Sequence, residues 1–305
     1  MTTIVFPGQG SQYHGMAKDF VDNFKISKTI LEEIEDYTSL DLRKILFDDS
    51  DDRLNQTKFT QIAIFTASLI IYKTLENQTN TLNVNCMLGH SLGEYTALVC
   101  SNKISLEEGS KILIKRGNLM NTAVEPNKTG MAALIGISSV NLEKIIKNKN
   151  LNIEIANDNS PLQVVISGLK EDINECKDIL EKNGVKKFVN LNVSAAFHSK
   201  YMSHAQEELS NEINNLNMVK NNIKIISNFT SKSSSDNEVI IDALKNQMSN
   251  RVKWTQSIME LEKLNQKKII EIGPGQILSG LIRRISKNFD IVSINKLSDL
   301  NMLAN

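Results

Sequence analysis

The stretch VNCMLGHSLGE, residues 84 to 94, decides the fold that we expect. A mostly apolar run leads into a Gly-x-Ser-x-Gly motif, and a helix-forming run from Glu94 to Cys100 leads out of it. This order predicts a strand, a sharp turn and a helix, with the hydroxyl of Ser91 raised above a sheet. The two glycines permit the tight turn and a close approach of the backbone. Without that context the motif could equally be a plain glycine-flanked turn.

In this setting Ser91 is the candidate nucleophile of an enzyme that forms an acyl-serine. The backbone amide of Leu92, at the positive end of the following helix, is placed to stabilise an oxyanion. Gln9 lies in a Gly-Gln-Gly loop directly after the apolar run Ile4 to Phe6. Loops at the carboxyl ends of parallel strands line the ligand crevice, so Gln9 could present a second amide. Phosphate binding by this loop is an alternative, although the Walker spacing and its lysine are missing.

A serine hydroxyl needs a base, and the chain has four histidines: His14, His90, His198 and His204. From the residues alone each of them is a candidate. His90 adjoins Ser91, but neighbours on a strained turn point in different directions. His198 follows an inserted block and should lie beside a cleft between two domains, where sites are common. For His14 and His204 a surface or structurally satisfied histidine remains an alternative.

Arg116 is flanked by apolar positions on a predicted helix. Composition alone favours a solvated helical arginine. The alternative is a bidentate clamp for a substrate carboxylate.

Composition indicates an ordinary globular protein of 305 residues, with 41% hydrophobic and 23% charged residues. Lys and Arg total 35 and Asp and Glu total 35, so nothing requires a nucleic acid or an anionic membrane as partner. No signal peptide and no membrane-spanning stretch are predicted. The three cysteines, Cys86, Cys100 and Cys176, form no disulfide or metal pattern, so we expect a cytoplasmic protein without a metal.

Strands and helices alternate along the chain, which predicts an α/β protein with a parallel, hydrolase-like sheet covered on both faces. The expected strands are Ile4–Phe6, Val84–Leu88, Met131–Ile137, Leu151–Ala156, Gln163–Ser167, Val185–Val193, Ile223–Phe229, Lys268–Ile272 and Ile291–Ile294. The expected helices are segments between Met16 and Tyr72 that break near 49–52, Glu94–Cys100, a helix opened by a capping box at Ser105 and Glu108, Val140–Lys149, Leu169–Asn183, Trp254–Leu264 and a helix ending at Ile285.

The middle of the chain has a different texture. Its order, β-α-β-β-α-β, is that of a ferredoxin-like fold. We therefore expect a small ferredoxin-like subdomain at 127–194, inserted into a large catalytic α/β subdomain made of 1–126 and 195–305. The segment SKSSSD, 231–236, is predicted to be a polar loop.

The motifs together resemble the malonyl-CoA:acyl carrier protein transacylase family over nearly the whole chain. They occur in family order: FPGQGSQ at 6–12, Thr60-Gln61, GHSLGE at 89–94, Arg116, NDNSPLQVVISG at 157–168, Phe197-His198-Ser199, NRVKW at 250–254 and EIGPG at 271–275. Two departures from the common pattern occur, one at a single position and one in the run before His198. Leu162 stands where the family often has Gly, and Ala195-Ala196 stand where many housekeeping members carry a proline. The latter resembles free-standing acyltransferases of polyketide synthesis, so the pathway stays open.

The resemblance implies a role for each matched position. Ser91 is the acyl-accepting nucleophile, His198 is its base, and the amides of Gln9 and Leu92 form the oxyanion hole. Arg116 binds the free malonyl carboxylate. The other implied pocket residues are Gln61, His90 and Phe197, whose ring leaves no room for a methyl branch, and the main-chain carbonyl of Asn250 orients the histidine.

The implied reaction is ping-pong transfer of malonyl from malonyl-CoA to the phosphopantetheine thiol of an acyl carrier protein, for fatty-acid or polyketide synthesis. It needs no metal and no bound cofactor, and the enzyme is expected to be a monomer. Two rivals remain: an acyl hydrolase acting on carrier proteins with the same Ser91 and His198, and a degenerate carrier-docking module without activity. A buried cation at Arg116 would argue against the hydrolase.

Overall fold

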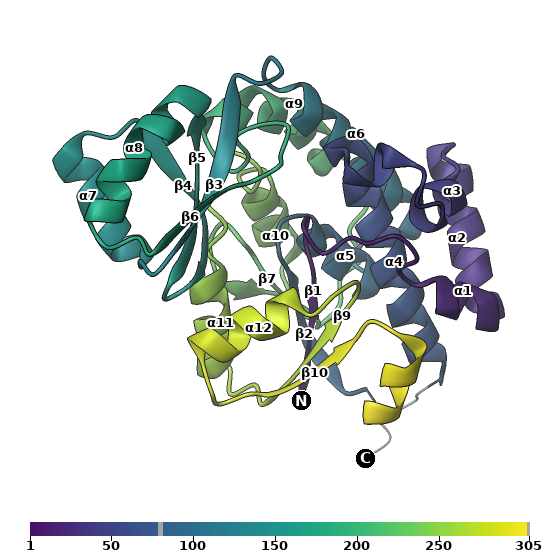
Figure 1. The fold of residues 1–305 in the computed structure, drawn as a ribbon. Helices are drawn as coiled ribbons and strands as arrows, with labels where there is room; N and C mark the ends of the chain where they lie inside the picture. The colour runs from purple at the N-terminus through teal and green to yellow at the C-terminus, as the bar shows by residue number, and fades with distance from the viewer. Residues whose placement is uncertain (79–81, 304–305) are drawn as a thin grey trace.

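The computed structural model describes residues 1–78 and 82–303 and contains two sheets (Figure 1). The strands of the larger sheet are β1 (Thr2–Phe6), β2 (Val84–Gly89), β7 (Lys224–Ile226), β8 (Ser233–Ser234), β9 (Lys268–Ile272) and β10 (Asp290–Ile294). Their order is β10-β9-β1-β2-β7-β8, and every pair is parallel except β7 with β8 at the edge. The carboxyl ends of β1 and β2 therefore lie side by side.

Helices cover both faces of this sheet, as alternation along β1 requires. Ile4 and Phe6 pack with residues of α4, α5 and α6, whereas Val5 packs with Trp254 and Leu281 on the opposite face. The helices outside the insertion are α1 (Lys18–Asn23), α2 (Lys25–Thr38), α3 (Leu42–Phe47), α4 (Thr57–Gln78), α5 (Leu92–Cys100), α6 (Leu106–Thr122), α9 (Ser203–Asn214), α10 (Asn237–Leu244), α11 (Trp254–Lys263) and α12 (Ile277–Ile285), with 3-10 turns η1 (Asp52–Asn55), η2 (Lys200–Met202) and η3 (Leu297–Leu303).

The smaller sheet is antiparallel throughout, in the order β4-β5-β3-β6. Its strands are β3 (Thr129–Ile135), β4 (Ile153–Ser160), β5 (Gln163–Leu169) and β6 (Lys187–Asn190), and its helices are α7 (Ser139–Lys149) and α8 (Lys170–Lys182). The two helices cover one face of the sheet with apolar residues such as Leu142 and Leu180 (Figure 1). The predicted fold class, a parallel α/β unit with a ferredoxin-like insertion, is confirmed. The subdomain boundaries at 127–194 stay a proposal.

Several predicted elements differ in extent. The polar segment 231–236 contains the short strand β8, because Ser233 and Ser234 pair with Ile226 and Ile225. The expected strands at 185–193 and 223–229 are shorter, at Lys187–Asn190 and Lys224–Ile226. By contrast, β4 runs on to Ser160 through two irregularities in its register with β5. That extension brings the polar residues Asn157, Asp158 and Asn159 next to the larger subdomain.

The extended end of β4 joins the two sheets through a group of hydrogen bonds that we call the seam. The amide of Asp158 donates to the carbonyl of Val252 at 2.9 Å, and the amide of Val252 donates to the carbonyl of Ala156 at 2.8 Å. The hydroxyl of Thr255, on α11, donates to the Asp158 carboxylate at 2.9 Å. The insertion is thus tied to α11 and the segment before it by backbone bonds and by a buried carboxylate.

Among residues 1–78 and 82–303, no helix has both the length and the apolar character needed to cross a bilayer.

Candidate active site

Ser91 sits at the turn between β2 and α5, with a φ of +54° that is uncommon for a serine. The turn is possible because backbone segments touch where side chains would otherwise stand. A Cβ at Gly89 would lie 2.0 Å from the carbonyl carbon of Gly93, and one at Gly93 would lie 2.3 Å from the carbonyl oxygen of Phe6. Both motif glycines are therefore required by close packing of the strand end against the helix start.

His198 meets the hydroxyl of Ser91. Its Nε2 lies 2.8 Å from Ser91 Oγ, and its Nδ1 lies 3.0 Å from the carbonyl of Gln247 and 3.1 Å from the carbonyl of Asn250. Carbonyls only accept hydrogen bonds, so Nδ1 carries the proton and Nε2 is free to accept one from Ser91. His198 also has a positive φ, +55°. The structure thus brings together the expected pair and the expected carbonyl of Asn250, and it adds that of Gln247.

Burial keeps His198 in its neutral form. The imidazole is 4% exposed, and desolvation followed by the positive charge of Arg116 lowers its pKa to about 3. A neutral imidazole at physiological pH is the form that can take a proton from serine.

Arg116, on α6, is 1% exposed, so the solvated helical arginine suggested by composition is wrong. Its Nη2 donates to Ser91 Oγ and to Gln247 Oε1, both at 3.0 Å, and its Nη1 donates to Gln61 Oε1. The guanidinium also lies over the ring of Tyr95, 5.4 Å from the centroid. Within the described part of the chain it forms no ion pair with a carboxylate. A buried cation without an anionic partner is a ready site for a substrate carboxylate.

A small cavity of about 90 Å³ opens beside these groups, between the main sheet and the insertion. Leu92 is the first residue of α5, so its amide has no acceptor within the helix. Gln9 faces the same cavity from the loop after β1, and Phe197 forms part of its wall. The lining residues are Gln9, His90, Ser91, Leu92, Arg116, Met120, Met131, Asn157, Leu191, Val193, Phe197 and His198.

The remaining sequence candidates divide into two groups. His90 lines the cavity, but its Nε2 is 2.9 Å from Asn159 Oδ1 and its ring packs on Trp254, so it braces the end of β4. His204 lies outside the cavity on α9, with a highly exposed side chain 3.2 Å from Glu208. His14, in the segment before α1, is also absent from the cavity lining. Of the four histidines, only His198 contacts the hydroxyl of Ser91.

Two residues of the site carried no sequence signal. Asn228, in the loop after β7, accepts from the amide of Ser91 through Oδ1 at 2.6 Å. Gln247, in the loop before α11, donates through Nε2 to the carbonyl of Ser91 at 2.9 Å. Both are single amide side chains far from Ser91 in sequence, and only the fold brings them to the turn.

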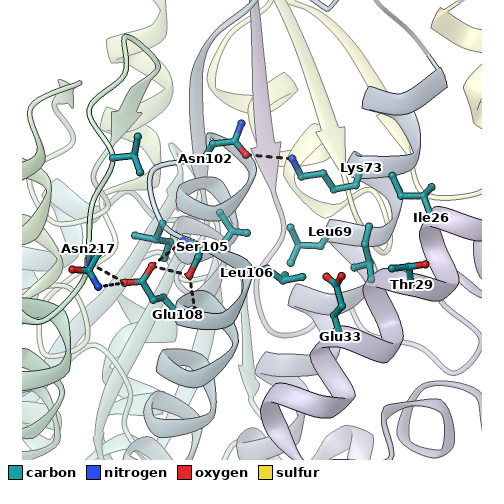
Figure 2. Close-up of a pocket in the computed structure, with 14 residues that line it drawn as sticks. Ile26, Thr29, Glu33, Leu69, Lys73, Asn102, Ser105, Leu106, Glu108 and Asn217 are labelled. Carbon is teal, nitrogen blue, oxygen red and sulfur yellow. Dashed lines mark hydrogen bonds between the residues drawn. The ribbon is translucent and has the colours of Figure 1, made fainter.

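A larger hollow of about 620 Å³ lies elsewhere, between α2, α4 and the start of α6 (Figure 2). Its lining residues include no histidine or cysteine. Its one serine, Ser105, caps α6 by exchanging hydrogen bonds with Glu108. Figure 2 shows Glu108 turned toward Asn217 and Lys73 toward Asn102, so these polar groups are mutually satisfied. This hollow therefore holds no serine–histidine pair like that of Ser91 and His198.

No group of three or more His, Cys, Asp or Glu side chains able to hold a metal ion occurs in the described ranges.

Comparison with known proteins identifies the family of this chain. A family model described as an acyl transferase domain matches residues 3–296. The malonyl CoA-acyl carrier protein transacylase of Staphylococcus aureus is 35% identical over 302 residues, which cover 98% of this chain and 97% of the relative. The polyketide biosynthesis malonyl CoA-acyl carrier protein transacylase PksC of Bacillus subtilis is 36% identical over 291 residues, 94% of this chain and 98% of the relative.

Solved structures agree over the full length. The malonyl CoA-acyl carrier protein transacylase of Clostridium perfringens superposes with a TM-score of 0.92 at 33% identity, covering 99% of this chain and 96% of that one. A malonyl-transacylase solved in complex with its type II polyketide acyl-carrier protein gives 0.94 at 30% identity, covering 99% and 98%. The chain therefore belongs to the acyl transferase family of malonyl-CoA:acyl carrier protein transacylases.

Proposed function

We propose that this enzyme transfers the malonyl group of malonyl-CoA to the phosphopantetheine thiol of an acyl carrier protein. The observation that carries the proposal is the meeting of three groups at one oxygen. His198 Nε2 lies 2.8 Å and Arg116 Nη2 lies 3.0 Å from Ser91 Oγ. A serine and a histidine alone would serve any acyl group, whereas the guanidinium adds a site for a free carboxylate, which malonyl has and acetyl lacks.

In the first half-reaction Ser91 Oγ attacks the thioester carbonyl of malonyl-CoA while Nε2 of His198 takes the hydroxyl proton. The amides of Leu92 and Gln9 stabilise the resulting oxyanion. The carbon–sulfur bond then breaks, and His198 returns the proton to the departing thiolate of coenzyme A. Malonyl-Ser91 remains, with its carboxylate held by Arg116.

In the second half-reaction the carrier's phosphopantetheine thiol gives its proton to His198 and attacks the ester of malonyl-Ser91. A carbon–sulfur bond forms, the ester bond breaks, and His198 returns the proton to Ser91 Oγ. The solved complex of a carrier protein with its malonyl-transacylase supports this acceptor. The relatives include one named for polyketide biosynthesis, and the product is an extender unit for fatty-acid or polyketide synthesis.

Two expectations from the sequence belong to the proposal. The enzyme is proposed to act as a monomer, as expected from the sequence. The cysteines Cys86, Cys100 and Cys176 are buried and free, which supports a reducing, cytoplasmic location. The rival acyl hydrolase gains nothing from the buried guanidinium of Arg116, which would face its acyl group.

Mass spectrometry of the protein after incubation with malonyl-CoA tests the proposal. We expect a malonyl adduct on the peptide that contains Ser91, its loss in Ser91→Ala, and its discharge when a phosphopantetheinylated carrier protein is added. Ser203→Ala, at an exposed position on α9, is the control and should keep the adduct. An adduct that persists in Ser91→Ala, or that water discharges as fast as the carrier does, would overturn the transferase mechanism.

A further inference from the structure

Glu94 ends the motif GHSLGE, and the mechanism above gives it no task. It lies on the first turn of α5 and is completely buried, and burial raises its pKa to about 7. Its Oε2 accepts two hydrogen bonds, from the amide of Asn228 at 3.0 Å and from Nε2 of Gln247 at 2.8 Å. Its Oε1 has no partner among the described residues. A single carboxylate oxygen therefore holds two loops that reach the site from different parts of the chain.

The first loop secures the nucleophile turn. Asn228 Oδ1 accepts from the amide of Ser91 at 2.6 Å, and Asn228 Nδ2 donates to the carbonyl of Gly89 at 2.7 Å. The side chain thus bridges the turn on both sides of His90. Because the positive φ of Ser91 is unfavourable by itself, such external bonds are what keep it in place.

The second loop secures the base and the cation. The main-chain carbonyl of Gln247 accepts from Nδ1 of His198 at 3.0 Å, and its side-chain Oε1 accepts from Nη2 of Arg116 at 3.0 Å. Its Nε2 donates to the carbonyl of Ser91 at 2.9 Å as well as to Glu94. The position of Gln247 therefore sets the positions of all three reacting groups relative to one another.

We propose that Glu94 is a positioning residue, the shared acceptor through which Asn228 and Gln247 hold Ser91, His198 and Arg116 in reactive geometry. The inference rests on the proposed acyl transfer. Hydrogen bonds to a buried carboxylate oxygen are strong, and a displacement of about 1 Å in such a site costs on the order of 100-fold in rate.

The test compares Glu94→Ala with Glu94→Gln by the single-turnover rate of malonylation of Ser91, followed by quenching and mass spectrometry. Glutamine keeps one carbonyl oxygen that can accept both bonds, so we expect a rate within about 5-fold of wild type. Alanine removes the acceptor, so we expect a loss of about 100-fold. The rescue by glutamine is the readout that a purely structural role would not give.

Glu271 provides the matched control. It is also completely buried, and its carboxylate accepts hydrogen bonds from the amides of Leu278 and Ser279. These two residues lie at the start of α12, outside the cavity. Glu271→Ala should lower the melting temperature and leave the malonylation rate of the folded protein within about 2-fold.

A double-mutant cycle tests the connection itself. Gln247→Ala keeps the main-chain carbonyl that accepts from His198, and it removes the side-chain bonds to Glu94, Arg116 and the Ser91 carbonyl. If both act through one hydrogen bond, adding Gln247→Ala to Glu94→Ala costs much less than it costs in the wild type. Asn228→Ala keeps the amide that donates to Glu94 and removes the side-chain bonds to Ser91 and Gly89, so its cycle with Glu94→Ala tests the other loop. If Glu94→Ala does not fold, Glu94→Leu, which also removes the acceptor, takes its place in both cycles.

Three outcomes overturn the inference: wild-type rate in Glu94→Ala, a rate in Glu94→Gln as low as in Glu94→Ala, or fully multiplicative losses in both double variants. A fluorophosphonate probe separates this failure from that of the proposed function. Ser91 Oγ bonds to its phosphorus, fluoride leaves and His198 takes the proton, with no malonyl group involved. If wild type takes no malonyl but the probe reacts in the order wild type, Glu94→Gln, Glu94→Ala, the transferase proposal fails and the positioning role holds.

Discussion

Nη2 of Arg116 lies 3.0 Å from Oγ of Ser91, and the same oxygen lies 2.8 Å from Nε2 of His198. The Ser91 oxygen accepts from the cation and donates to the base. A malonyl thioester has one methylene between its carboxylate and the carbonyl under attack, so the two ends must be bound close together. The short distance between Arg116 and Ser91 therefore fits a small diacid chain.

Replacing Arg116 by Ala should lower malonyl transfer while acetyl transfer holds or rises. Leaving a buried charged partner unpaired costs about 2–5 kcal/mol, which corresponds to roughly 30- to several-thousand-fold in kcat/KM. The measurement is kcat/KM for malonyl-CoA and acetyl-CoA with wild type and variant. Arg116→Lys should recover little, because an ammonium lacks the planar fork that reaches Gln61 and Gln247 together. An equal loss for both substrates would make the arginine structural.

His198→Ala should slow acylation of Ser91 by several powers of ten, as loss of a catalytic base generally does. The rate of appearance of malonyl-Ser91 measures it. His204→Ala and His14→Ala are the matched controls and should remain near wild type, because neither residue lines the cavity. Loss of acylation in either control variant would identify that histidine as the base and contradict the assignment of His198.

Phe197→Ser should admit methylmalonyl-CoA. The ring is 4% exposed and forms part of the cavity wall next to His198, so we expect it to exclude a methyl branch. We expect the ratio of kcat/KM for methylmalonyl-CoA to that for malonyl-CoA to rise at least about 10-fold, since one extra methyl group in a fitted pocket is worth about 1–3 kcal/mol. An unchanged ratio would show that another residue of the cavity, and not Phe197, excludes the methyl branch.

Acylation should keep its rate as the pH falls from 8 to 5. Desolvation lowers the pKa of His198 to about 3, so the imidazole stays neutral across this range. With an ordinary pKa of about 6.5, only about 3% of it would be neutral at pH 5. Protonation of Glu94 in the same range leaves a carbonyl oxygen to accept both of its bonds. Single-turnover malonylation at each pH decides the matter, and a midpoint near 6.5 would contradict it.

Glu94→Gln should become more stable relative to wild type as the pH rises from 4 to 8. Burial raises the pKa of Glu94 from 4.5 to about 7, so the folded state holds the proton where the unfolded state has lost it. Wild type therefore loses stability as the pH rises through this interval, by about 3 kcal/mol in total, and glutamine does not ionise. Urea unfolding at pH 4.5 and pH 8 measures the change. If the difference in unfolding free energy between Glu94→Gln and wild type does not grow with pH, the pKa of Glu94 is not raised in the folded protein.

The sequence predicts the fold well where periodicity and burial agree. The strands that lead to Ser91 and Gly273 are apolar runs bounded by glycine, and both occur as expected. The prediction of a loop throughout 231–236 was wrong, because Ser233 and Ser234 form β8 by pairing with β7. No apolar alternation marks these two serines as a strand. The extension of β4 to Ser160 is likewise held by cross-strand bonds and irregular register instead of by side-chain pattern.

The site divides in the same way. Ser91, His198 and Arg116 stand in motifs, and the structure brings them to one oxygen, although their catalytic roles stay predictions. Gln247 and Asn228 are single amides in loops, and no local pattern records which distant backbone atoms they will meet. Their importance comes from hydrogen bonds that span 156 and 137 residues of chain, which only the folded geometry reveals.

The seam between β4 and the segment 252–255 affects how malonyl-CoA and the carrier protein reach Ser91. Turning the inserted sheet away from the main sheet would break the bonds that join Asp158 to Val252 and Thr255, and it would pull Asn159 from His90. We therefore expect these hydrogen bonds to resist a hinge motion of the inserted sheet when substrates bind. The long, flexible pantetheine arms of coenzyme A and of the carrier protein then supply the conformational freedom needed to enter and leave the site in turn. Exchange of the acyl group needs no domain opening in the enzyme.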